Sequence, residues 1–187
     1  MPKVILLHCC CAPCSSAIIE WMLLHDIRPT LFYCNPNIYP EEEYIRRKDE
    51  CTRYARSLGL DIVDDDYNHD QWLCHVRGLE KEPERGARCL QCFRMRLART
   101  AAYAHQHGFD TIATTLASSR WKNLEQIDRA GVEACAPYPD VSFMAKNWRK
   151  GGLQQRRVEI IKEMNFYNQT YCGCEFSFRN ADNGNDK

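Results

Sequence analysis

The sequence predicts an α/β domain built around a mostly parallel β-sheet. Short apolar runs alternate along the chain with longer amphipathic or charged segments, the order in which parallel strands and crossover helices follow one another. The 187 residues are 44% hydrophobic and 11% aromatic, so a chain of this length can bury a core of its own. We therefore expect a single α/β domain over residues 1–178 and a polar, disordered tail over residues 179–187.

The individual elements follow from apolar periodicity and from turn residues. Strands are expected at the short apolar runs, over residues 3–8, 29–33, 60–63, 111–114 and 141–144. Helices are expected over residues 15–25, 41–58, 70–76, 89–107, 121–130 and 153–164. Ser15 and Ser16 are expected to cap the first helix, and Gly59 and Gly108 to end the second and fourth.

A cysteine-rich loop comes directly after the first strand. His8 ends that strand as an expected core residue, and Cys9-Cys10-Cys11-Ala12-Pro13-Cys14 follows. Ligands of open parallel sheets bind outside the carboxyl ends of the strands, so this loop should form a metal site at that edge. The next helix would direct its N-terminus at the loop, where the positive dipole end favours thiolates, the form that binds metal.

The twelve cysteines do not indicate secretion. Only a short apolar run precedes His8, whereas a signal peptide needs about 7–15 apolar residues and a membrane-spanning helix roughly 18. We therefore expect a cytoplasmic protein with no membrane partner, whose clustered cysteines bind metal or are redox-active. The net charge is zero, so nucleic-acid binding would need a local basic patch.

The cysteines fall into three groups and four isolated positions. The groups are Cys9-Cys10-Cys11 with Cys14, Cys89 with Cys92, and Cys172 with Cys174. One C-x-x-C pair is a weak signal, but three groups in one chain are a strong one, and thiols three residues apart at a helix start can chelate one metal. Cys9 and the isolated thiols are expected to be small buried hydrophobic residues, these being Cys34, Cys51, Cys74 and Cys135.

Four thiolates suit either zinc or an iron–sulfur cluster. A purely structural zinc usually joins two knuckles of otherwise unsupported chain, whereas the first cysteine group here follows a core strand at the expected active edge. A redox iron–sulfur cluster is therefore the favoured interpretation. A thioredoxin-like redox pair is a third alternative, although it would leave the remaining cysteines unexplained.

Six segments resemble the cobalamin-independent epoxyqueuosine reductase family, QueH. They occur in that family's order and span nearly the whole chain. The most specific are NPNIYP, within the second segment, and YCGC, within the last. The segments are HCCCAPCSS (8–16), FYCNPNIYPEEEY (32–44), GLEKEPERGARCLQCFRMRLARTA (78–101), GFDTIATTL (108–116), NWRKGG (147–152) and YCGCEFS (171–177).

The resemblance implies an oxidoreductase that converts epoxyqueuosine to queuosine at the wobble position of tRNA, the last step of queuosine biosynthesis. It implies a 4Fe–4S cluster, a second mononuclear iron or other divalent metal, and an external electron donor. It also implies a Rossmann-like sheet related to the PP-loop and HUP-type nucleotide-binding folds. In those relatives a Gly/Ser-rich loop holds ATP pyrophosphate, and HCCCAPCSS stands in its place, which argues against ATP use.

Carried over by position, the resemblance implies seven cysteines as metal ligands, and their spacing divides them between the two metal groups. The expected cluster ligands are Cys10, Cys11, Cys89 and Cys92. The expected catalytic residues, which would hold the second iron, are Cys14, Cys172 and Cys174. Three departures stand out. Cys9 is an extra thiol beside the usual pair, and Asn147 stands where an acidic residue is expected and is assigned no role. SSRWKN (118–123) also differs from the family's usual Ser-Pro stretch, which bears on how substrate is held.

A tRNA substrate requires a basic surface with stacking residues despite the zero net charge. Basic residues gather near the expected metal ligands, and the alternative is that they form solvated helix faces. The expected tRNA contacts are Arg94, Arg96, Trp148, Arg149 and Lys150. Two other functions remain open: a tRNA thiolation enzyme, which would need an ATP loop, and a non-catalytic zinc-binding interaction module.

Overall fold

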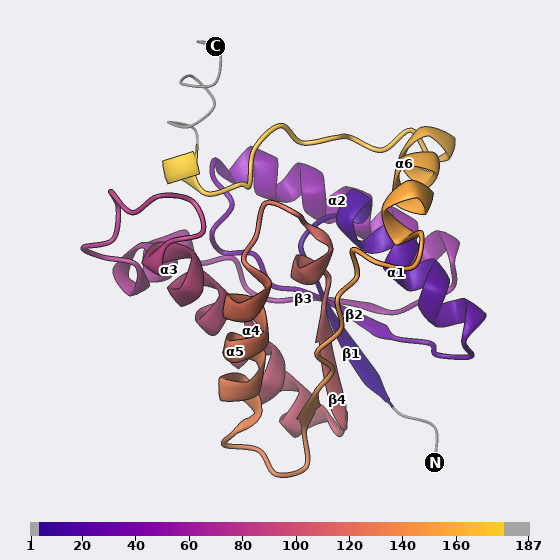
Figure 1. The fold of residues 1–187 in the computed structure, drawn as a ribbon, viewed down its shortest axis with the longest axis horizontal. Coiled ribbons are helices and arrows are strands. Elements are labelled where there is room, and N and C mark those ends of the chain that lie inside the picture. Colours follow the sequence, from indigo (N-terminus) through magenta and orange to yellow (C-terminus); the bar gives the residue numbers. More distant parts are fainter. Residues whose placement is uncertain (1–3, 178–187) are drawn as a thin grey trace.

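The computed structural model describes residues 4–177 and contains a five-stranded sheet in the order β3-β2-β1-β4-β5 (Figure 1). Every neighbouring pair is parallel, which confirms the predicted α/β class. The expected disordered tail, 179–187, lies outside the described residues. The strands are β1 (Ile5–Cys9), β2 (Thr30–Tyr33), β3 (Ile62–Asp64), β4 (Thr111–Thr114) and β5 (Ser142–Phe143).

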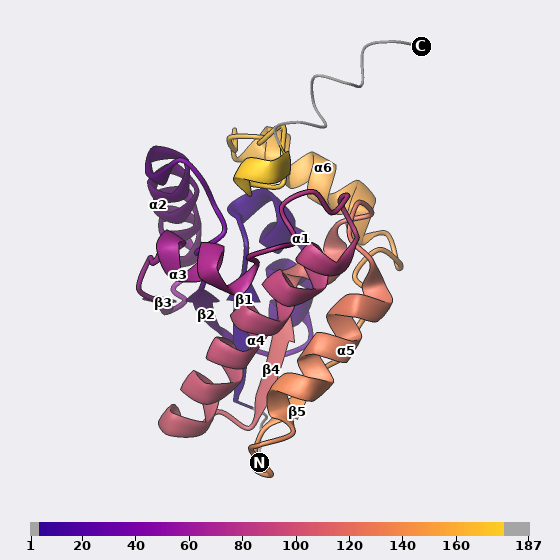
Figure 2. The ribbon, with the colours of Figure 1, turned by 90° about the vertical axis from the view of Figure 1, so that its left-hand side faces the viewer.

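Helices cover both faces of the sheet (Figures 1 and 2). Helix α1 packs against α2 and α6 on one face, and α4 packs against α3 and α5 on the other. The helices are α1 (Ala12–Leu24), α2 (Glu41–Ser57), α3 (His69–His75), α4 (Ala87–His107), α5 (Leu124–Cys135) and α6 (Leu153–Glu163), with short 3₁₀ turns η1 (Thr115–Ser118) and η2 (Glu175–Ser177). Within residues 4–177, none of these helices has the length and apolar character to cross a membrane.

The chain changes direction across the sheet between β1 and β4. From β1 it moves outward through β2 and β3, then returns past β1 to form β4 and β5. His8 of β1 stands in register with Thr114 of β4, so both strands end at the same level. Such a switch point leaves a crevice beyond the carboxyl ends of the two strands, where parallel sheets bind ligands.

The first helix begins earlier than the sequence predicts, and this changes how the cysteine loop is held. Helix α1 begins at Ala12 with Cys11 at its N-cap and Pro13 in its first turn, where a fixed φ favours helix initiation. Ser15 and Ser16 are therefore not N-caps. Their hydroxyls lie inside the first turn and donate to the carbonyl groups of Cys11 and Pro13 at 2.7 and 3.3 Å.

Two further element boundaries have local causes. Helix α5 begins later than predicted because the side chain of Asn123 accepts a hydrogen bond from the Gln126 amide at 3.3 Å and so caps the helix. Helix α4 ends as predicted at Gly108, whose φ of 75° lies in the left-handed region that glycine adopts without strain. Strand β4 has the predicted boundaries.

Helix α5 packs on β5 through Gly131. A Cβ atom at that position would overlap the ring of Phe143. Alanine favours a helix over glycine by about 1 kcal/mol, but overpacking a core costs roughly 1–3 kcal/mol. We predict that Gly131→Ala lowers the free energy of unfolding by about 1 kcal/mol in denaturant titrations.

The adjacent Val132 provides the matched control because it lies on the exposed side of the same helix. Val132→Ala should change the free energy of unfolding by about 0.5 kcal/mol or less. If Gly131→Ala is as stable as wild type, the Phe143 ring can move away from the added methyl group without loss of unfolding free energy, and the prediction is contradicted.

Candidate metal centre

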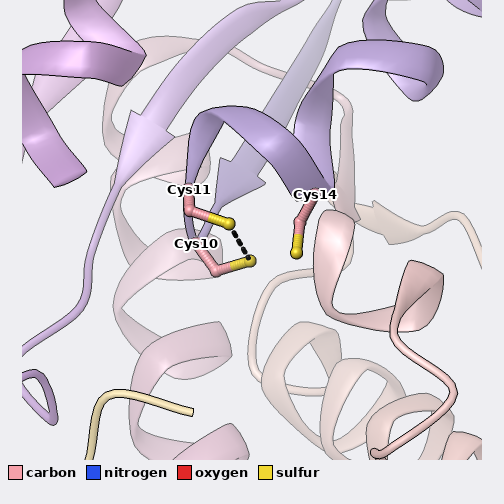
Figure 3. A group of neighbouring side chains, drawn as sticks. All are labelled: Cys10, Cys11 and Cys14. Atoms are coloured by element: carbon pink, nitrogen blue, oxygen red, sulfur yellow. Dashed lines mark hydrogen bonds between the residues drawn. The ribbon is translucent and has the colours of Figure 1, made fainter. Parts of the chain in front are cut away.

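Three of the expected metal ligands lie side by side beyond the carboxyl end of β1. Cys10 and Cys11 belong to the loop after the strand, and Cys14 lies in the first turn of α1 (Figure 3). Their sulfur atoms lie within 4.8 Å of one another, and those of Cys10 and Cys11 are 3.8 Å apart. Thiols this close, at the N-terminus of a helix, form a binding site for a thiophilic metal.

The three thiols differ in how readily they lose a proton. Cys11 and Cys14 donate hydrogen bonds to Cys10 and, with the nearby Lys122 ammonium, hold the pKa of Cys10 well below its usual value. Burial, followed by the hydrogen bonds with Cys10 and Cys14, raises the pKa of Cys11, so Cys10 loses its proton more readily than Cys11. Metal binding requires thiolates, and this arrangement holds one of them ready.

The other four expected ligands lie outside this group of three, so among the described residues the four expected cluster ligands are not brought within 4.8 Å of one another. Cys92 and Cys174 pack in one small apolar cluster with Trp72. Burial, followed by the charge of Cys172, raises the pKa of Cys89 to about 11. Burial, followed by the charges of Cys172 and Cys92, raises the pKa of Cys174 to about 12. Segments far apart in the sequence therefore bring their thiols within electrostatic reach of one another.

Lys122 lies between the two groups of thiols. Its Nζ atom is 3.7 Å from the sulfur of Cys172. Burial opposes the charge of this ammonium, but the thiols of Cys172, Cys10 and Cys14 outweigh that effect and raise the pKa of Lys122 above its usual value. The sequence prediction did not identify this residue, although it singled out the SSRWKN segment that contains it.

Arg96 of α4 is a second buried cation that contacts the thiols. It is buried and donates to the sulfur of Cys92 at 3.8 Å, to the Cys34 carbonyl at 3.2 Å, and to the side chain of Asn35. Arg96 nevertheless lines the cavity, so its predicted contact with tRNA stays a prediction. Its guanidinium supplies positive charge to the thiol site.

Arg47 of α2 holds the C-terminal segment that contains Cys172 and Cys174. Its guanidinium pairs with Glu43 at 2.6 Å and donates to the Cys172 carbonyl at 3.2 Å. Gly173 has a φ of 117°, and a Cβ there would lie 3.0 Å from the Arg47 side chain, which explains glycine between the two cysteines. The Gln169 amide donates to the sulfur of Cys11 at 2.7 Å.

A cavity of about 810 Å³ opens over this site. Four of the seven expected thiols line it, and Cys89, Cys92 and Cys174 are not among its lining residues. Its lining also includes the amide side chains of Asn37 and Gln169, each with a buried oxygen that has no hydrogen-bond partner. The lining thiols are Cys10, Cys11, Cys14 and Cys172. Polar groups without partners on a cavity wall are groups that a ligand can satisfy.

The remaining predicted surface contacts divide into two sets. Trp148 is 1% exposed, its indole N–H donates to the Thr114 carbonyl at 3.1 Å, and its predicted stacking role is therefore wrong. Arg94 is engaged in an ion pair with Glu133 at 2.7 Å. Arg149 lines the cavity and donates to the Lys122 carbonyl at 2.8 Å, and Lys150 is exposed.

The thiols expected to be structural follow the prediction with one exception. Cys9, Cys34 and Cys51 are buried, and Cys135 is partly buried. Cys9 lies outside the cluster of three, and its thiol donates to the Leu7 carbonyl at 3.4 Å. Cys74 is exposed, so the expectation that it is buried is wrong.

Comparison with known proteins gives the family. The family model described as epoxyqueuosine reductase QueH matches residues 5–180. The chain belongs to the QueH family. A QueH protein of Acinetobacter baylyi is 45% identical over 95% of this chain and 81% of its own length. The Haemophilus influenzae QueH is 46% identical over 95% and 72%, and the Thermotoga maritima QueH is 35% identical over 92% and 89%.

The donor set of this QueH chain fits a thiol-bound metal group. Three sulfurs of the first cysteine group are close enough to share a metal, and Lys122 and Arg96 bring positive charge to the sulfurs of Cys172 and Cys92. Buried thiolates require such compensation, since an unpaired buried charge is strongly unfavourable. A cysteine-rich site that can bind a metal is therefore present.

His8 joins the site to the sheet and gives a pH test. Its ring bridges the Thr114 hydroxyl at 2.9 Å and the Cys34 carbonyl at 3.0 Å. Burial, followed by the charge of Arg96, lowers the pKa of His8 from 6.5 to about 3. Between these pH values the unfolded chain binds a proton that folded His8 does not, so stability falls as pH drops below 6.5, by about 1.4 kcal/mol per pH unit for this group.

We predict that His8→Gln makes the pH dependence of unfolding shallower over this window in metal-free protein. His75 is exposed and serves as the control, since His75→Gln should keep the wild-type slope. Denaturant titrations between pH 4 and pH 7, at roughly one-unit steps, measure both. Parallel curves for wild type and His8→Gln would contradict a neutral, buried His8.

Proposed function

We propose that this protein reduces the epoxide of epoxyqueuosine in tRNA to queuosine, with iron held by its clustered thiols. The observation that carries the proposal is a cavity at the sheet's switch point that is lined by the clustered thiols of Cys10, Cys11 and Cys14 and by Cys172, in a member of the QueH family. The cavity volume of about 810 Å³ lies in the range of small-ligand sites and suits a single modified nucleoside.

For the metal groups, we propose the division expected from the family resemblance. Cys10, Cys11, Cys89 and Cys92 would hold a 4Fe–4S cluster, and Cys14, Cys172 and Cys174 a second iron or other divalent metal. In the structure Cys14 lies with Cys10 and Cys11 and not with Cys172 and Cys174, so this division would need the second metal to bind directly beside the cluster. When bound, the cluster would supply electrons one at a time and the second iron would act as a Lewis acid.

Conversion of the epoxide to an alkene consumes two electrons and two protons and releases the oxygen as water. An external donor must therefore supply the electrons. Lys122 holds a positive charge at its Nζ atom on the cavity wall beside Cys172, where it can donate a hydrogen bond to the departing oxygen. The unpaired oxygens of Asn37 and Gln169 can accept hydrogen bonds from a nucleobase edge and so orient the substrate.

The two alternative functions lack comparable support. A tRNA thiolation enzyme needs a phosphate-binding loop after its first strand, and here the position is occupied by the cysteine loop that ends in Cys14. A non-catalytic zinc module would have no use for a cavity over its thiols, and the family relationship is to a reductase.

The activity is tested with anaerobically purified protein reconstituted with iron and sulfide. We predict that it converts epoxyqueuosine in tRNA to queuosine with dithionite as donor, detected by nucleoside mass spectrometry as the loss of one oxygen atom. Cys89→Ser should lose more activity than the roughly 10–100-fold that removal of an outer-shell partner costs. Cys74→Ser, at an exposed thiol outside the site, should keep wild-type activity. Full activity of a zinc-only protein would refute the proposal.

A further inference from the structure

One tryptophan differs from the others in its surroundings. Trp72 and Trp148 are buried and Trp21 is partly buried, whereas Trp121 is 65% exposed. Trp121 also lines the cavity that opens over the thiols. A large indole left in solvent at the edge of a ligand cavity provides apolar area and an aromatic face to a ligand.

The residues around Trp121 concentrate positive charge on a chain whose net charge is zero. The Arg120 guanidinium lies 4.9 Å from the centre of the Trp121 ring. Arg149 and Arg157 line the same cavity, and among its described lining residues Glu84 is the one carboxylate. A cationic cavity edge with an exposed aromatic ring has the chemistry of a single-stranded nucleic-acid site.

A tight turn links Trp121 to the reacting end of the cavity. The backbone amide of Trp121 donates to the Ser119 hydroxyl at 3.4 Å, and that of Lys122 donates to the Ser119 carbonyl at 3.2 Å. Trp121, whose indole is exposed, is therefore followed directly in the chain by Lys122, whose ammonium lies 3.7 Å from the sulfur of Cys172. A base stacked on the indole would therefore be held in a fixed relation to the thiol site.

We propose that Trp121 and Arg120 form a stacking platform for a base that adjoins the target nucleotide in the substrate RNA. The inference rests on the proposed function. A nucleotide that enters the cavity leaves its stack, and its neighbour loses a stacking partner. The indole replaces that partner, since base–aromatic stacking is tolerant of sequence and favourable for any base. Trp121 thereby takes the stacking role that the sequence assigned to Trp148.

Binding of a fluorescently labelled anticodon stem–loop RNA, measured by anisotropy, tests the platform. Trp121→Ala should weaken binding about 5- to 150-fold, the factor that corresponds to the loss of one stacked base, with no change in salt dependence. Trp121→Phe should restore most of the affinity. Arg120→Ala should reduce the slope of log affinity against log salt by about 0.7.

Two controls separate stacking from a general loss of apolar surface. Leu24→Ala, at an exposed apolar residue that does not line the cavity, should bind like wild type. Two further RNAs each lack one base, either the base before the wobble nucleotide or the base after it. The RNA that lacks the stacked base should bind wild type and Trp121→Ala with equal affinity. Circular dichroism of each variant verifies that it is folded.

The outcomes distinguish the platform from the activity itself. If wild type binds and reduces its substrate while Trp121→Ala keeps full affinity, the platform is refuted and the reductase assignment stands. Equal losses for Trp121→Phe and Trp121→Ala, or a loss that the base-deleted RNAs do not remove, would also refute stacking. If wild-type protein neither binds the RNA nor reduces epoxyqueuosine, the proposed function fails and the platform fails with it.

Discussion

Buried positive charge and buried thiols depend on each other in this protein. Arg96, Arg47 and Lys122 come from different parts of the chain, and all three reach the cysteine segments. A buried cation without an anionic partner is strongly unfavourable, and so is a buried thiolate without a cation. The position of α4, the turn before α5 and the C-terminal segment are therefore tied to the cysteine loop that follows β1. The sheet positions this loop, because the switch point between β1 and β4 leaves a crevice beyond the carboxyl ends of these two strands.

The sequence predicts the elements well because apolar runs and turn residues act locally. Strand β4 is found at its predicted residues, and Gly108 ends α4 in the left-handed conformation that its residue type allows. The sequence places the start of α1 too late, because serine is a preferred N-cap residue, whereas Pro13 in the first turn allows the helix to begin directly after Cys11. Strand order could not be predicted, since periodicity indicates which residues are buried and does not indicate which strands pair.

The thiols of the site can be predicted from the sequence, but the basic residues beside them cannot. Cysteines are scarce enough that their groups stand out in a sequence, and the end of a strand gives them a location. Lys122 and Arg96 were not recognised as part of the centre, because burial of a basic residue depends on partners that are distant along the chain. Trp148 was assigned to the surface because basic residues follow it, but the Thr114 carbonyl at the end of β4 takes its indole N–H.

The mutual dependence of thiols and cations is tested most directly by the iron affinity of Lys122→Met in the reconstituted protein, measured by competition with a chelator. Lys150→Met, at an exposed lysine, and Lys122→Arg serve as controls. Loss of the cation beside Cys172 should weaken iron binding by about 10–100-fold, as loss of other outer-shell partners does, while both controls retain iron like wild type. A folded Lys122→Met protein that holds iron as tightly as wild type would contradict this dependence.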